Sequence, residues 1–330
     1  MIEQLKTPVA VIVFKRLDAT KKMFESLRAA RPKDLYIIAD GWRNEAEKAK
    51  CLAVRKFLSS AVDWPCNVHE NYSDTNLGLK KRIVSGLNWV FSQVEEAIVL
   101  EDDCVADQSF FPFCQELLTK YRNEPRVMQI AAMNVQERNR DFDTNGKSYY
   151  FSQFGEIWGW ATWRRAWALY DADLSAWPEA KRSGLLAKRI KDPAVVDYLE
   201  YRYDFVKAAG DDRKKSDVWG AQWIFTQLLH GGVSIVPKTN LVSNVGDDND
   251  ATNAKEAIKQ SPFNRMRAVP MQFPLVHPAH IQINEQADAY SLKESTGVKS
   301  AWSEKIVFFI KTFAPPLYRL LKRIKLLINT

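Results

Sequence analysis

Residues Ala97-Ile-Val-Leu-Glu-Asp-Asp103 join a short apolar run directly to three acidic side chains. An uninterrupted apolar run of this length is typical of a strand that is buried on both faces, as in a parallel sheet. Acids that follow such a strand lie at the carboxyl edge of the sheet, where open α/β sheets bind their ligands. The segment therefore predicts a buried parallel strand with a charged site at its end.

Further apolar runs precede this segment and alternate with helical patterns. Pro8–Phe14 and Leu35–Ala39 are such runs, residues 66–72 are another expected strand, and a helix is expected over Gly78–Phe91. Alternation of strands and helices implies right-handed crossovers and a largely parallel sheet. We therefore expect an α/β, Rossmann-like fold with helices on both faces of the sheet.

Polar side chains follow three of these expected strands. Lys15 and Arg16 follow the first strand, Asp40 follows the second, and the triplet Glu101-Asp102-Asp103 follows the fourth. Carboxyl ends of parallel strands meet at one edge of the sheet. We expect these side chains to form one site.

The second half of the chain is less regular. It contains the aromatic segment Gly155–Trp167, a helical pattern over Asp217–Leu229 that ends at Gly231-Gly232, and an expected strand at Val233–Val236. Four tryptophans lie between positions 158 and 167, and they could stack on sugars or form ordinary core. For Trp163 and Trp167 we favour the core.

Composition and charge restrict the class of protein. The 330 residues are 46% hydrophobic and 26% charged, which is typical of a folded globular protein. Residues 301–330 carry six basic side chains against one acidic, a net +5 that leaves +2 of the total +7 for the other 300 residues. A nearly neutral body argues against a phosphate-tracking surface, so no nucleic-acid partner is expected.

Targeting and redox signals favour the cytoplasm. Four cysteines without a CxxC pair fit reduced thiols better than a disulfide framework, and no disulfide is expected. The apolar run Val9–Phe14 is too short for a signal peptide or a membrane span.

The segment 301–330 predicts a basic amphipathic helix. Apolar residues recur there at spacings of three and four, with most lysines and arginines between them, and Pro315-Pro316 would kink or split the helix. Such a helix can lie on an anionic membrane, or it can pack against protein. Membrane binding would place the protein on the inner face of the membrane, near a lipid-linked acceptor.

The acidic triplet has two interpretations. Its acids could point into solvent or cap the next helix. Their position directly after a buried strand instead favours a hard cation, Mg²⁺ or Mn²⁺, which binds one or two carboxylates together with the oxygens of a diphosphate.

At this point the chain resembles glycosyltransferases with the GT-A fold. The triplet is similar to the EDD segment of the N-acetylglucosaminyltransferases of complex N-glycan synthesis. The whole pattern is more similar to bacterial family 2-like nucleotide-diphospho-sugar transferases, sometimes labelled haemolysin-like. The resemblance covers roughly residues 8 to 253, and its shared segments are the first strand with Arg16, Asn76-Leu-Gly78, the acidic triplet, Ile157–Trp163, Trp219 with Gln222-Trp223, and Asn240–Gly246.

The resemblance implies a role for each matching residue near the donor. Arg16 and Asp40 would hold the base and ribose of a nucleotide-sugar, and Asp103 would be the direct metal ligand. Free N–H groups at the start of the helix expected over Gly78–Phe91 could bind a diphosphate. The other expected donor-binding residues are Asn76, Gly78, Lys80, Lys81, Arg82, Glu101 and Asp102.

Inverting sugar transfer also needs a carboxylate as base. The resemblance implies Asp217, although that acid could equally favour a helix dipole, and Glu156 is the second candidate. Trp158, Trp160 and Trp219 would contact the acceptor. Relatives often have a His in an Asp-Ala-Thr-His pattern where this chain has Asp250-Ala-Thr-Asn253, so metal dependence stays open.

These observations predict a metal-assisted, inverting glycosyltransferase. It would move a sugar from a nucleotide-diphospho-sugar, with UDP favoured, to a hydroxyl of a surface polysaccharide or lipid-linked glycan. The expected organisation is a catalytic GT-A domain over 1–255, a wrapping segment over 256–300 and a C-terminal helix over 301–330. The alternatives are an inactive membrane-associated protein that binds nucleotide-sugars, and a sugar nucleotidyltransferase.

Overall fold

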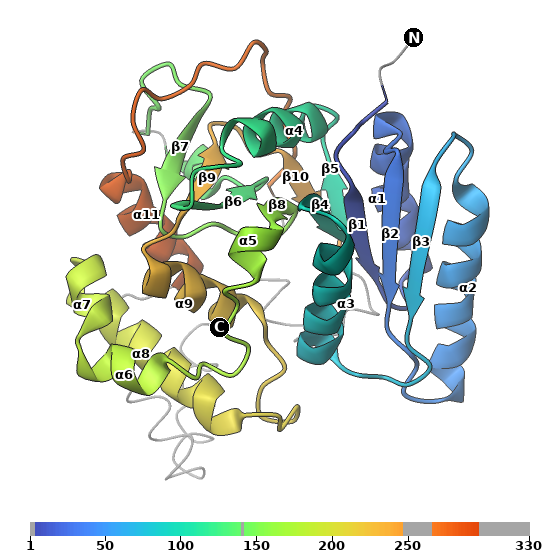
Figure 1. Ribbon diagram of the computed structural model, residues 1–330, viewed down its shortest axis with the longest axis horizontal. Coiled ribbons are helices and arrows are strands. Elements are labelled where there is room, and N and C mark those ends of the chain that lie inside the picture. Colours follow the sequence, from blue (N-terminus) through green and yellow to red (C-terminus); the bar gives the residue numbers. More distant parts are fainter. Residues whose placement is uncertain (1–3, 140–141, 247–265, 297–330) are drawn as a thin grey trace, which may run out of the picture.

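The computed structural model describes residues 4–139, 142–246 and 266–296. Its centre is an eight-stranded sheet of order β3-β2-β1-β4-β8-β6-β9-β7 (Figure 1). The first half of the chain forms β1 (Val9–Val13), α1 (Leu17–Ala30), β2 (Asp34–Ala39), α2 (Glu45–Ala61), β3 (Asn67–Tyr72), α3 (Leu79–Gln93), β4 (Glu96–Glu101), β5 (Cys104–Ala106) and α4 (Phe110–Lys120).

The four strands β3, β2, β1 and β4 are parallel neighbours. In their register Val13 lies opposite Ala39 and Ile12 lies opposite Glu101, so the carboxyl ends of β1, β2 and β4 reach one edge together. The strands and the helix α3 lie where the sequence predicted them. This half of the sheet fixes the position of the predicted site.

Alternate residues of these strands enter two cores on opposite faces of the sheet. Val11 packs in the core that contains Phe24 of α1, whereas its neighbour Ile12 packs in the core that contains Leu87 of α3. The period of two follows from strand geometry, and fully apolar strands satisfy both faces at once. The predicted α/β class, with helices on both faces, is confirmed.

The second half of the sheet is mixed. β8 is antiparallel to both β4 and β6, β6 is parallel to β9, and β7 is antiparallel to β9, so six of the eight strands share one direction. The elements here are β6 (Val127–Ala131), a 3-10 helix (Val135–Arg138), β7 (Tyr149–Ser152), β8 (Trp160–Trp163), α5 (Arg164–Trp167), β9 (Val233–Pro237) and β10 (Val242–Asn244).

A group of helices packs beside this mixed half. It comprises α6 (Trp177–Arg182), α7 (Leu185–Arg189), α8 (Pro193–Ala209), α9 (Gly220–His230) and α11 (Glu285–Thr296). Figure 1 places α6, α7 and α8 together at the lower left, apart from β1–β3. Their own apolar core includes Trp177, Tyr203 and Phe225, and Leu292 of α11 joins it.

Gln129 of β6 is the centre of a buried polar network. Its Oε1 accepts hydrogen bonds from Trp223 Nε1 (2.7 Å) and Gln227 Nε2 (2.9 Å), and its Nε2 donates to the Glu156 carbonyl (2.7 Å). Ser234 Oγ on β9 donates to Gln227 Oε1 (2.7 Å). The network ties β6, β9, α9 and the segment before β8 into one unit.

Two expectations fall outside the described residues. Asp250-Ala-Thr-Asn253 and the expected helix 301–330 lie there, as does part of the expected wrapping segment. Among the described helices, none combines the length and apolar character that a membrane crossing requires.

Candidate active site

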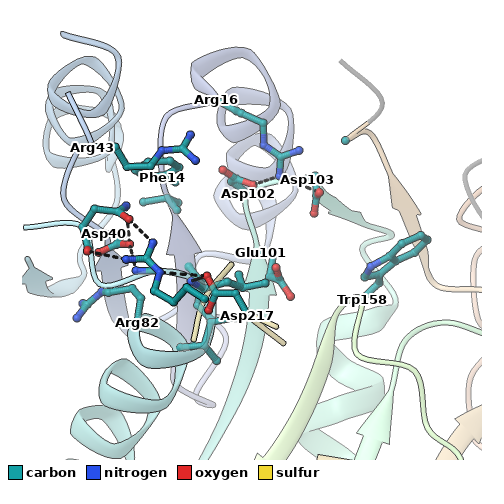
Figure 2. A pocket seen from close by; sticks show the side chains of 18 of the residues that line it. Phe14, Arg16, Asp40, Arg43, Arg82, Glu101, Asp102, Asp103, Trp158 and Asp217 are labelled. Carbon is teal, nitrogen blue, oxygen red and sulfur yellow. Dashed lines mark hydrogen bonds and ion pairs between the residues drawn. The ribbon is translucent and has the colours of Figure 1, made fainter. Parts of the chain in front are cut away.

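A cavity of about 240 Å³ opens at the carboxyl ends of β1, β2 and β4. It collects side chains from all three predicted strand ends, namely Arg16, Asp40 and the triplet Glu101-Asp102-Asp103. The start of α3 and residues 213, 217, 244 and 246 also line it. We call it the donor cavity, after the sugar donor that the sequence predicts. Figure 2 shows Asp40 and Arg82 on one side of the donor cavity and the Arg16–Asp102–Asp103 group on the other.

The acidic triplet forms the turn between β4 and the short strand β5. β5 pairs with β10, and Val245 N donates to the Asp103 carbonyl (2.9 Å), which brings residues 244–246 over the turn. Arg16 Nη2 donates to Asp102 Oδ1 and to Asp103 Oδ2, the latter at 2.8 Å. One guanidinium therefore faces two acids of the triplet.

The three carboxyl groups lie near this one cation, and of them Asp102 is buried while Glu101 and Asp103 are half-buried. Burial and the charges of Asp103 and Asp102 raise the pKa of Glu101 to about 8. Burial raises the pKa of Asp102 to about 6, although Arg16 opposes the shift. Like charges this close favour proton uptake or an additional positive charge.

The residues fit a divalent cation held jointly with a ligand. In the described part of the chain, no three His, Cys, Asp or Glu side chains converge as a complete metal site. Mg²⁺ is usually held by one or two carboxylates plus substrate phosphates, and Asp103 with its neighbours could supply those carboxylates. The triplet has three carboxyl groups and, among the described residues, only Arg16 as a neighbouring cation, so a bound divalent cation would balance its negative charge.

Gly246 makes the close contact above the triplet possible. A Cβ atom at this position would overlap Asp103 Oδ2 and lie 2.8 Å from Arg16 Nη1. The Gly246 N–H donates to Asn244 Oδ1 (2.8 Å). A larger residue at position 246 would displace the Asp103 and Arg16 side chains, whereas glycine lets the backbone approach this charged group closely.

Asp40 holds the loop that leads into α3. Its carboxylate accepts hydrogen bonds from the backbone N–H groups of Gly41, Leu77 and Gly78 and from Asn76 Nδ2, at 2.9–3.0 Å. Burial nevertheless raises the pKa of Asp40. The predicted residues Asp40, Asn76 and Gly78 are brought together, and they bind one another.

Asp217 caps α3 from a distant part of the chain. Its Oδ2 accepts from Leu79 N and its Oδ1 accepts from Lys80 N, both at 2.9 Å. The expectation that N–H groups at the start of this helix are free for a diphosphate is therefore corrected, because Asp40 and Asp217 already bind three of them. Asp217 does favour a helix dipole, but that of α3 and not of the helix that follows it.

Arg82 is the buried cation on the α3 side of the cavity. It is 5% exposed, its Nη2 donates to Asn71, and its Nε has no hydrogen-bond partner within the described residues. Burial lowers the pKa of Arg82. An orphaned guanidinium N–H beside a cavity suits an anionic ligand.

Lys80 and Lys81 do not line the donor cavity, contrary to expectation. Lys80 Nζ pairs with Asp173 (3.1 Å), and Lys81 Nζ pairs with Asp211 (2.8 Å). Arg213 takes their place as a cation at the rim, where its Nη2 donates to Asn76 Oδ1 (2.6 Å).

Phe14 and Arg43 line the end of the cavity beside β1 and β2. The Arg43 guanidinium lies 5.6 Å from the centre of the Phe14 ring (Figure 2). An aromatic ring beside a guanidinium can stack on a planar base. Sequence reasoning missed both residues, although Phe14 ends the first predicted strand and Arg43 lies four residues after the second.

A second cavity of about 310 Å³ is lined by mostly apolar side chains of residues 154–157, α8, the start of α9 and α11. Glu156 and Trp219 line this second cavity, whereas Trp158 lines the donor cavity. Trp160 lines neither. It is 1% exposed and stacks on Trp219 with ring centres 5.6 Å apart.

The expectation that Trp160 contacts an acceptor is therefore corrected. Its ring is fully enclosed in an aromatic core with Trp167, Trp219 and Trp223, which leaves no surface for a ligand. Trp163 and Trp167 are buried, as favoured from the sequence.

No protein-family model matches this chain, and no curated protein does. Among solved structures, a galactosyltransferase in complex with donor and acceptor sugar analogues is 12% identical over 53% of this chain, with a TM-score of 0.31. The match spans 64% of that galactosyltransferase.

Two further solved structures are similar over half of this chain. One is 4-diphosphocytidyl-2C-methyl-D-erythritol synthase from Anaerococcus prevotii, 11% identical over 75% of its own chain, with a TM-score of 0.32. The other is a structure from Bacillus anthracis assigned as a glucose-1-phosphate thymidylyltransferase in complex with sucrose, 10% identical over 74% of its own chain, with a TM-score of 0.33. All three are partial likenesses.

Proposed function

We propose that the protein is a metal-assisted glycosyltransferase of the GT-A type that transfers a sugar from a nucleotide-diphospho-sugar, with UDP favoured, to an acceptor hydroxyl with inversion. One observation carries the proposal. A buried acidic turn follows a parallel strand and shares one cavity with the cations Arg16 and Arg82. Such a cavity has carboxylates that can bind a metal and guanidinium groups that can bind a diphosphate.

The donor would lie across the carboxyl ends of β1, β2 and β4. Phe14 and Arg43 would flank the base, and Arg82 would bind a phosphate oxygen through its free Nε. Asp103, supported by Asp102, would hold Mn²⁺ or Mg²⁺, which stabilises negative charge on a departing nucleoside diphosphate. Arg16 would keep the two acids in place.

For the base we favour Glu156 over Asp217. Both carboxylate oxygens of Asp217 accept backbone N–H groups, so this acid would serve to position α3. Burial raises the pKa of Glu156 to about 7. A carboxyl group of that pKa can accept a proton from a hydroxyl near neutral pH.

The acceptor would be a surface polysaccharide or a lipid-linked glycan. Its hydroxyl would approach between Trp158 and Glu156, which lie on one short segment between the two cavities.

The test is donor turnover by the full chain. UDP-, GDP-, CMP- and dTDP-sugars are incubated with the protein, with Mn²⁺ or with EDTA, and the released products are quantified. We expect one sugar nucleotide to release its nucleotide only with the metal. Release of pyrophosphate from a nucleoside triphosphate and a sugar phosphate would instead identify a nucleotidyltransferase, and binding without turnover would identify an inactive binding protein.

A further inference from the structure

The second cavity differs from the donor cavity in its lining. Its walls include Ile157, Leu199, Val218 and Ile224, so most of the surface that it offers is apolar. At about 310 Å³ it falls within the range of small-molecule sites, roughly 300–1,000 Å³. A cavity of this size and lining suits a hydrocarbon group of modest length.

Two charged side chains, Glu156 and Arg202, line the same cavity without an ion-pair partner among the described residues. Throughout residues 4–139, 142–246 and 266–296, the Glu156 carboxylate has neither a hydrogen bond nor an ion pair, and Arg202 has no acidic partner. Arg202 Nη1 makes only a long hydrogen bond to Tyr198 Oη (3.4 Å). A guanidinium beside an apolar wall, with this one long hydrogen bond and no acidic partner, suits an anionic group.

Two short segments join this cavity to the donor cavity. Ile157 lines the second cavity and Trp158 lines the donor cavity, while Asp217 lines the donor cavity and Val218 lines the second one. Leu79 at the start of α3 lines both. The two cavities are therefore adjacent, and a molecule in the second cavity would lie next to the donor.

From this juxtaposition we infer that the second cavity binds an amphiphilic acceptor, whose apolar part lies among Ile157, Val218 and Ile224 and whose anionic group pairs with Arg202. The inference rests on the proposed function and specifies its acceptor class. The acceptor hydroxyl is then directed to Glu156, at the side nearest the donor. A neutral, fully polar glycan would leave both the apolar wall and Arg202 without a partner.

The test uses three probes that share one six-carbon chain, together with inorganic phosphate, which has none. Hexyl phosphate, hexanol, hexyltrimethylammonium and inorganic phosphate are titrated into the full chain, and binding is followed by saturation-transfer NMR. We expect hexyl phosphate to bind at least about tenfold more tightly than the other three, because only it satisfies both the wall and Arg202.

Two variants locate the binding. Arg202→Gln removes the preference for hexyl phosphate over hexanol, and Val218→Trp fills the cavity and removes binding of both. Arg182→Gln is the matched control, because Arg182 is a solvent-exposed arginine of the same helical group that pairs with Glu179. Circular dichroism and thermal unfolding check that each variant is folded.

Unchanged preference for hexyl phosphate in Arg202→Gln, or failure of every hexyl probe to bind the folded wild type, would overturn the inference. A separate titration with sugar nucleotides and Mn²⁺ keeps the two proposals apart. Probe failure with intact nucleotide binding refutes only the amphiphilic acceptor, whereas nucleotide failure with intact probe binding refutes the glycosyltransferase and leaves a cavity that binds amphiphiles without an acceptor role.

Discussion

The donor cavity and the second cavity lie side by side but hold their charged groups differently. In the donor cavity, Arg16 faces Asp102 and Asp103, and Asp217 binds the start of α3, so most charges already have protein partners. In the second cavity, Glu156 and Arg202 face a mostly apolar wall without opposite charges among the described residues. The first arrangement suits a charged donor whose groups replace some of these protein–protein ion pairs. The second suits a ligand with an apolar part for the wall and an anionic group for Arg202.

The largest effect is expected at Asp103, where the donor cavity would hold its metal. Asp103→Asn should reduce metal-dependent nucleotide release by about 10³-fold, because the carboxylate that stabilises the cation is lost. Product release measured at saturating Mn²⁺ tests this. Asp74→Asn, at an exposed turn after β3, is the matched control. Full activity in Asp103→Asn would remove this acid from the metal site.

Replacing Arg16 tests how much its ion pairs with Asp102 and Asp103 stabilise the fold. Arg16→Met should lower the free energy of unfolding by about 3 kcal/mol, because Asp102 and Asp103 then stay buried without their guanidinium. Urea denaturation measures the loss. Added Mn²⁺ should restore part of it, and an equal loss with and without Mn²⁺ would argue against a cation at the triplet.

A variant of Asp217 distinguishes a residue that positions α3 from a residue that acts as the base. Asp217→Ala should cost about 1 kcal/mol of stability, because Leu79 and Lys80 lose the cap of α3. If Glu156 is the base, the variant keeps a measurable rate whose dependence on pH matches that of the wild type. Loss of that pH dependence in Asp217→Ala, but not in Glu156→Gln, would reverse the assignment.

The last expected effect is the pH dependence of stability from Glu156. Its folded-state pKa, about 7, lies above the ordinary 4.5, so the folded state holds the proton more tightly. The stability from this proton is fully present below pH 4.5 and is lost as the pH rises through 7. Glu156→Gln should therefore gain about 4 °C in melting temperature over the wild type between pH 5 and pH 8. Parallel pH profiles for the two proteins would contradict this.

The parallel half of the fold could be predicted because each strand there is an apolar run with its own polar end. The same logic placed Arg16, Asp40 and Asp103 at one edge, where the structure also has them. In the mixed half, β9 and α9 lie close to the strand and helix predicted at Val233–Val236 and Asp217–Leu229, but the position of β8 could not be predicted in this way. β8 is a four-residue, tryptophan-rich strand inserted between β4 and β6, and its composition cannot distinguish core from a sugar-binding surface.

Hydrogen bonds between side chains that are far apart in the chain also could not be predicted from the sequence. Asp217 caps a helix that starts 138 residues earlier, and Arg213 bonds to Asn76 across 137 residues. Local spacing contains no signal for such pairs. Lys81 illustrates the opposite error, because helical position alone suggested a site residue that the structure directs toward Asp211.

The buried side chain of Gln129 limits how the neighbouring carboxyl group can move. Gln129 connects the Glu156 carbonyl to Trp223 and Gln227 of α9, so the backbone at Glu156 cannot shift without breaking these bonds or carrying α9 along. Rotation about the side-chain bonds of Glu156 breaks none of these hydrogen bonds and does not move α9. Any adjustment of this carboxyl group to a bound molecule is thereby confined to fast rotamer changes on a stationary main chain.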